Sequence, residues 1–109
     1  METGKVFTAS RLTAGNFLFP VRIEVSRERV SRIRKSFFGS NEESIAISKV
    51  ASVNIQTGFL WSEIRIDSAG GTNPILSHGH RKKDAHAIRD LIEKFQKEAQ
   101  NPQRPADVV

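Results

Sequence analysis

The sequence predicts a single, mostly β domain, a barrel or sandwich of seven strands that ends in one amphipathic helix. The chain has 109 residues, which suits one domain rather than two. Short apolar segments recur about every eight to twelve residues, separated by Gly, Asn, Ser and Glu, as is typical of such folds. From Arg81 onward the apolar period changes from two to about 3.6, which indicates a helix.

The second and third strands carry the clearest patterns. Val21, Ile23 and Val25 alternate with polar residues, so we expect them to face the core. In the third strand, Arg32 and Arg34 share one face and should point away from the core unless they are paired. The seven strands are expected at Lys5–Leu12, Phe17–Ser26, Arg29–Lys35, Glu43–Ile47, Val50–Gln56, Leu60–Asp67 and Thr72–Ser77.

The later strands follow the same alternation, and short polar or glycine-containing segments end them. Phe37–Asn41 is expected to be a loop, and Thr57-Gly58 a turn. Pro74 cannot donate a backbone hydrogen bond, so the last strand should lie at an edge or carry a bulge. The residues expected to face inward are Ile45, Ile47, Val53, Ile55, Ile64 and Ile66.

The helix is expected at about 81–100. One face carries an apolar stripe and the opposite face is charged, with Glu93 and Lys97 as a favourable i,i+4 pair. Pro102 disfavours helix at the residue before it, so the helix should end near Gln100. We therefore expect one domain at 1–100 and a disordered tail at 101–109. The apolar stripe consists of Ala85, Ile88, Leu91, Ile92 and Phe95.

Composition excludes several classes of site. The chain has no cysteine, which removes disulfides, thiolate metal sites and cysteine nucleophiles. No apolar run approaches the roughly 20 residues of a membrane span, and the first 20 residues lack the pattern of a signal peptide. The sequence predicts a soluble, cytoplasmic protein.

A seven-stranded chain that ends in an amphipathic helix must bury the helix stripe, and the open end of a barrel is available for it. Several short motifs along the chain carry a further pattern: Val21–Val25, Arg29-Val30, Phe37–Gly39, Ile45–Ile47, Ala51–Val53, Trp61, Ile64–Ile66 and Lys83–Ile88. In these motifs, over about residues 16 to 96, the sequence resembles the short bacterial pleckstrin-homology-like domains. The resemblance implies a seven-stranded antiparallel barrel or orthogonal sandwich capped by the C-terminal helix, and a non-catalytic binding or assembly module.

The net charge of +5 is concentrated in one segment, where five basic residues between positions 27 and 35 oppose only Glu28. This segment is a candidate site for anionic lipid, because several basic residues acting together hold a protein at a charged surface. Phe37 and Phe38 could insert into the membrane interface beside this segment. Alternatively, one of them plugs the barrel mouth, and the basic residues only protect a strand edge from pairing. The candidate residues are Arg27, Arg29, Arg32, Arg34, Lys35, Phe37 and Phe38.

A second candidate surface is the hairpin tip at Phe59, Leu60 and Trp61. Trp61 fits a core position, but if the three are exposed together they form an apolar patch of the kind that mediates self-association. A neighbouring edge strand would add backbone pairing between copies.

Other chemistries have weaker signals. His78, His80 and His86 resemble a metal site only loosely, and no cofactor or metal is expected. No nucleophile elbow, paired carboxylates or phosphate loop is present, so the sequence predicts no enzyme and no small-molecule substrate. Nucleic acid is disfavoured because stacking aromatics are few and the charge lies on one hairpin.

These observations favour a non-catalytic interaction module whose partner is a protein, including a second copy of the chain. The alternative is peripheral binding to anionic lipid through the basic hairpin, which would place the protein at the inner face of the membrane.

Overall fold

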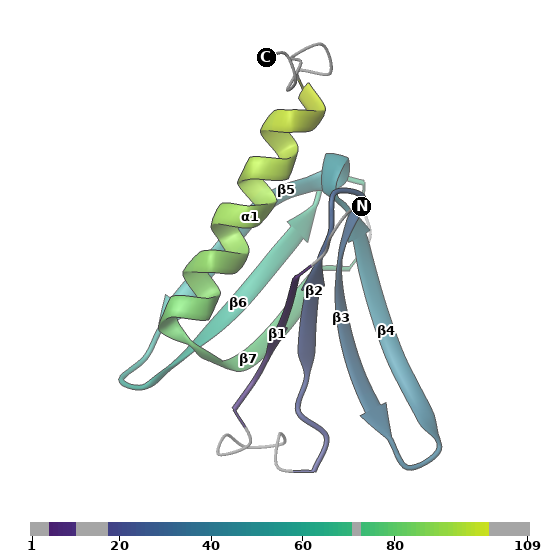
Figure 1. The fold of residues 1–109 in the computed structure, drawn as a ribbon, viewed down its shortest axis with the longest axis vertical. Coiled ribbons are helices and arrows are strands. Elements are labelled where there is room, and N and C mark those ends of the chain that lie inside the picture. Colours follow the sequence, from purple (N-terminus) through teal and green to yellow (C-terminus); the bar gives the residue numbers. More distant parts are fainter. Residues whose placement is uncertain (1–4, 11–17, 71–72, 101–109) are drawn as a thin grey trace.

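The computed structural model describes residues 5–10, 18–70 and 73–100, and shows two antiparallel sheets with one long helix packed against them (Figure 1). The first sheet has the strand order β1-β2-β3-β4 and the second has the order β5-β6-β7. The elements are β1 (Lys5–Thr8), β2 (Arg22–Val25), β3 (Arg29–Ser36), β4 (Gly39–Ala46), a 3-10 turn η1 (Ile47–Lys49), β5 (Val50–Thr57), β6 (Trp61–Ser68), β7 (Ile75–Arg81) and α1 (Lys82–Gln100).

The β2–β3 hairpin forms the centre of the first sheet. Val25 lies opposite Val30, and Ile45 of β4 lies on the other side of Val30. All three are buried, as are Val21 and Ile23, so the predicted inward positions of the second strand are confirmed. The inner face of this sheet is therefore apolar near the β2–β3 turn.

The second sheet has the predicted alternation. Ile64 and Ile66 of β6 are buried, and their register partners on β5, Ile55 and Val53, pack against the same core. Glu63, Arg65 and Asp67 of β6 face the opposite side of the sheet, because successive side chains of a strand alternate between faces.

Helix α1 buries its apolar stripe in the core between the sheets. Ala85, Ile88, Ile92 and Phe95 are buried, and Leu91 is partly buried against the same cluster. The side-chain amide of Gln96 donates to the backbone carbonyls of Ile47, at 3.2 Å, and Val50, at 3.0 Å. These two bonds fasten the helix to η1, where the chain passes from one sheet to the other.

Several expectations need correction. The described strands form two separate sheets and do not close into a barrel, since β4 and β5 are joined by η1 and do not pair. The expected loop at Phe37–Asn41 is only a two-residue turn, because β4 begins at Gly39 and pairs with β3 up to Ser36. The last strand is displaced toward the helix and includes His78-Gly79-His80.

The first two strands are shorter than expected, at Lys5–Thr8 and Arg22–Val25, and the expected positions between 11 and 17 lie outside the described residues. The tail expected at 101–109 also lies outside them. Within the described part of the chain, no helix is long and apolar enough to cross a membrane.

Candidate functional site

The β3–β4 turn carries two exposed phenylalanines. Phe37 is 77% exposed and Phe38 is fully exposed, and the rings of Phe37 and Phe19 form a T-shaped pair with a centroid distance of 5.0 Å. Gly39 follows with a φ of 153°, a backbone conformation that L side chains rarely adopt. Neither phenylalanine of the turn plugs the space between the sheets.

A small hollow lies beside this turn. It has a volume of about 270 Å³, and residues before and within β2 and β3 line it together with Thr8. Its apolar lining comes from Leu18, Phe19, Pro20 and Ile33, while Arg22 and Lys35 add positive charge. The turn and the hollow together present apolar surface next to cations.

The basic residues of the β2–β3 hairpin do not share one surface. Arg27 lies at the β2–β3 turn, where it pairs with Glu98 of α1 and its guanidinium carbon lies 5.5 Å from the centre of the Phe95 ring. Arg29 is exposed at the same end of β3. Lys35 is exposed at the other end of β3, next to the phenylalanine turn.

Arg32 and Arg34 do share a face, as predicted, but it is the inner face of the first sheet. Arg32 lies opposite Ile23 on one side and Glu43 on the other, and it has the same orientation as the buried Val30. The condition that such an arginine must be paired is met, because its guanidinium lies 3.8 Å from the carboxylate of Glu43. Arg34 is half-buried.

The β5–β6 turn is the second apolar tip. Phe59 is 90% exposed and Leu60 is 61% exposed, whereas Trp61 is half-buried at the start of β6. The Gly58 amide donates to the carbonyl of Trp61 at 2.9 Å, and a Cβ on Gly58 would lie only 3.0 Å from that oxygen. Close approach of the backbone therefore favours glycine here.

The two tips lie at one end of the molecule. In the lower half of Figure 1, opposite the C-terminal end of the helix, the β3–β4 turn lies at the right, and the β5–β6 turn and the beginning of α1 lie at the left. The basic residues Arg81, Lys82 and Lys83 are exposed where β7 passes into α1. We call this the turn end of the molecule.

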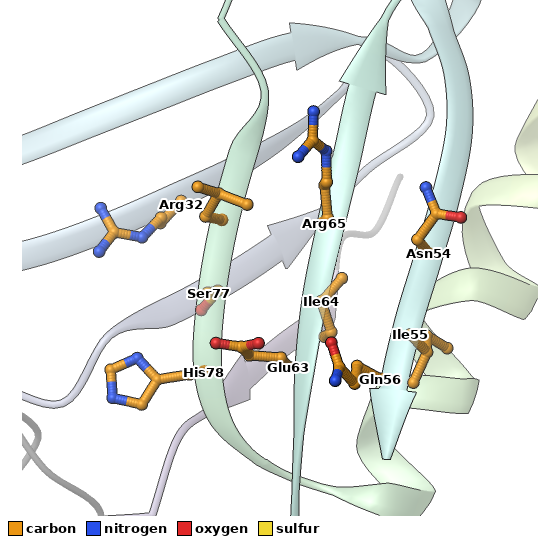
Figure 2. A pocket seen from close by; sticks show the side chains of 10 residues that line it. Arg32, Asn54, Ile55, Gln56, Glu63, Ile64, Arg65, Ser77 and His78 are labelled. Carbon is orange, nitrogen blue, oxygen red and sulfur yellow. The ribbon is translucent and has the colours of Figure 1, made fainter. Parts of the chain in front are cut away.

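A larger pocket, of about 710 Å³, covers the outer face of the second sheet and reaches Arg32 (Figure 2). It was missed from the sequence, where the outward residues of β6 indicate only a solvated face. The one available signal was the run of polar residues at alternate positions in two neighbouring strands. Its polar side chains are those of Arg32, Asn54, Gln56, Glu63, Arg65, Ser77 and His78.

One edge of this outer face is held by a small hydrogen-bond network. Arg65 Nε donates to Asp67 at 2.9 Å, and the Ser52 hydroxyl donates to the other oxygen of the same carboxylate at 3.0 Å. The bond from Arg65, followed by that from Ser52, lowers the pKa of Asp67 below its usual value of 3.8. The network fixes Arg65 along the sheet.

His80 is a fully buried residue of β7. Its Nε2 lies 2.6 Å from the Ser77 hydroxyl, and Nδ1 has no hydrogen-bond partner among the described residues. Burial lowers the pKa of His80 to about 4; Asp84 opposes this shift, while His78 and Arg32 add to it. This histidine is neutral near pH 7 and belongs to the interior.

The described residues contain no group of three or more histidine, aspartate or glutamate side chains placed to hold a metal ion. His86 lies on α1, where its Nδ1 is 3.3 Å from Arg89, and His80 is enclosed.

Comparison with known proteins found no matching family model and no matching curated protein.

Proposed function

We propose that the chain is a non-catalytic, pleckstrin-homology-like interaction module that binds an anionic membrane surface through its turn end. The supporting observation is that two exposed apolar tips, Phe37-Phe38 and Phe59-Leu60, lie at the same end of the molecule beside exposed basic residues. The two-sheet arrangement with a C-terminal helix is compatible with such a module.

The chemistry of the turn end matches the interfacial region of a bilayer. Large apolar side chains gain about 1.5–3 kcal/mol when they are fully buried. Each basic residue near an anionic leaflet adds about 1 kcal/mol. Phe37 and Phe38 would supply the apolar burial, and Lys35 would supply the attraction to the anionic leaflet. Further charge near the other tip comes from Arg81, Lys82 and Lys83. Together, these free energies of binding correspond to weak, reversible, peripheral binding.

Charge distinguishes a membrane from a second copy of the same end. Two turn ends placed face to face would bring the exposed cations of both copies together, and like charges without partners disfavour contact. An anionic surface attracts the same cations. The inner face of the membrane is the proposed location.

The test is binding to vesicles of phosphatidylcholine with and without phosphatidylserine, measured by co-sedimentation at low and high salt. The double variant Phe37→Ser/Phe38→Ser should weaken binding by at least about tenfold, since two apolar side chains no longer insert. Lys35→Ser should weaken it about fivefold. Val6→Ser removes an exposed apolar residue of β1 and should leave binding unchanged.

Binding that is equal for the double variant and the wild type would refute the role of the β3–β4 tip. Binding that does not depend on phosphatidylserine or on salt would refute the role of charge.

Self-association is the second candidate function, and the β5–β6 turn favours it. Phe59 and Leu60 are exposed, and β5 pairs only with β6 among the described strands, so a strand of another copy could pair with its other edge. Light scattering after size exclusion should then give a mass well above 12.2 kDa at low and high salt. Phe59→Ser/Leu60→Ser should restore the monomer, and a monomeric wild type would refute this candidate.

A further inference from the structure

Arg32 occupies an unusual position between the two sheets. Its backbone lies in β3 between Ile23 and Glu43, and its side chain is only 20% exposed. In Figure 2 the guanidinium emerges beside β7, on the same side of that strand as the imidazole of His78. A cation from the first sheet thus reaches the pocket on the outer face of the second sheet.

The guanidinium of Arg32 carries five N–H donors, and the one on Nε, which is buried, has no acceptor among the described residues. Its ion pair is the contact with Glu43, at 3.8 Å, which is too long for a hydrogen bond. A largely buried cation whose one ion pair is long is costly, so the guanidinium of Arg32 favours an additional, external acceptor at its terminal nitrogens.

The neighbouring groups also favour an anion. His78 lies beside Arg32 at the rim of the pocket, and Gln56 and the terminal nitrogens of Arg65 supply further donors from β5 and β6. Leu76, which is exposed, adds an apolar surface on the outer face of β7. The pocket, about 710 Å³ in volume, is large enough for a small organic molecule.

Two carboxylates limit the charge of the ligand. Glu63 lines the pocket, and Glu43 lies next to Arg32. A doubly charged phosphate would be repelled by both, whereas a carboxylate carries a single charge and fits the planar fork of one guanidinium. The carboxylate of Glu63 can in turn accept a hydrogen bond from a hydroxyl or amino group of the ligand.

We propose that the gap between β3 and β7 is a binding site for a small organic carboxylate, which Arg32 holds through its guanidinium while the rest of the ligand lies over the outer face of β5, β6 and β7. This site differs from the turn end in position and in ligand, and it does not depend on membrane binding. Glu43 competes with the ligand for the same guanidinium.

Because Glu43 competes with the ligand for Arg32, substitutions of these two residues should change ligand affinity in opposite directions. Binding of acetate would be followed by NMR, through the Nε–H signal of Arg32 and the backbone amides of β7, at constant ionic strength. Arg32→Gln should weaken acetate binding by at least about tenfold, because a charge-assisted bond is lost. Glu43→Gln should strengthen it about threefold, because an exposed competing carboxylate is removed.

Arg29→Gln is the matched control, since it removes one positive charge from the same strand at an exposed position outside the pocket, and it should bind acetate like the wild type. Acetate binding that is equal in the wild type and the Glu43→Gln variant would overturn the proposal even if Arg32→Gln fails to fold. Tighter binding of inorganic phosphate than of acetate would overturn the assignment to a carboxylate.

Discussion

Acidification is expected to destabilise the protein through one buried group, His80. The ring is fully buried, and burial lowers its pKa from 6.5 to about 4. Asp84 opposes the shift, and His78 and Arg32 increase it. Between these two pKa values the unfolded chain binds a proton at this position and the folded protein does not.

The sign and the size of the effect follow from proton linkage. Because the unfolded state binds the extra proton, the free energy of unfolding falls as the pH is lowered from about 6.5 to about 4, by about 1.4 kcal/mol per pH unit. The total is about 3 kcal/mol, of which about 2 kcal/mol is lost by about pH 5. The lowered pKa of Asp67 destabilises the protein mainly below about pH 5, so it contributes little between about pH 7 and about pH 5.

Urea unfolding at about pH 7 and about pH 5 measures this loss. His80→Gln keeps an amide that can bond to Ser77 but has no proton to gain. The loss of stability between the two pH values should be smaller in His80→Gln than in the wild type by about 2 kcal/mol. His86→Gln, at an exposed position on α1, should behave like the wild type. An equal loss in the wild type and His80→Gln would refute the reasoning.

Three further variants test the packing and the backbone. Ile88→Ala removes a fully buried side chain of α1 and should lower the free energy of unfolding by about 2–5 kcal/mol; a loss below 1 kcal/mol in urea unfolding would contradict this packing. Gln96→Leu removes the donor to the carbonyls of Ile47 and Val50 and should cost about 1–3 kcal/mol, with faster amide exchange around η1; unchanged exchange would argue against these bonds. Gly39→Ala should lower the thermal midpoint, at a cost of about 1–3 kcal/mol, because the φ of 153° suits glycine while no neighbouring atom opposes a Cβ; an unchanged midpoint would show that the turn can relax.

The apolar parts of the fold could be predicted from the sequence because they repeat. The alternation at Val21, Ile23 and Val25 and the helical spacing of Ile88 and Ile92 each leave one way to bury the apolar face, and these residues are buried. The pattern does not say whether the strands close into a barrel, because closure depends on hydrogen bonding between strands far apart in the sequence.

Two strands were misplaced because their residues are polar. β4 begins at Gly39 and continues through serine, asparagine and glutamate, and its pairing with β3 gives no apolar signal in the sequence. β7 includes His78-Gly79-His80, whose composition is typical of a loop, although His80 faces the interior. Backbone pairing with a neighbouring strand, rather than side-chain pattern, determines such segments.

For the candidate sites too, the sequence pattern predicts which residues share a face but not where that face lies in the fold. The spacing of Arg32 and Arg34 predicted a shared face, which the structure has. It did not predict that this face is the inner one, because Val30 has the same parity and Glu43 allows Arg32 to remain beside it. The exposure of Phe37 and Phe38 depends on a turn of only two residues, and the sequence could not distinguish that turn from a loop folded over the core.

The basic segment therefore has three physical roles rather than one. Arg27 stacks over Phe95 and pairs with Glu98, so its charge is used to hold the end of α1 against the β2–β3 turn. Arg32 lies between the sheets, where burial makes each missing acceptor costly. Only at the far end of β3, around Lys35, is charge exposed next to apolar side chains. Because the hairpin spans the length of the first sheet, residues that are close in sequence are separated along it. These residues therefore do not form one continuous surface in the structure.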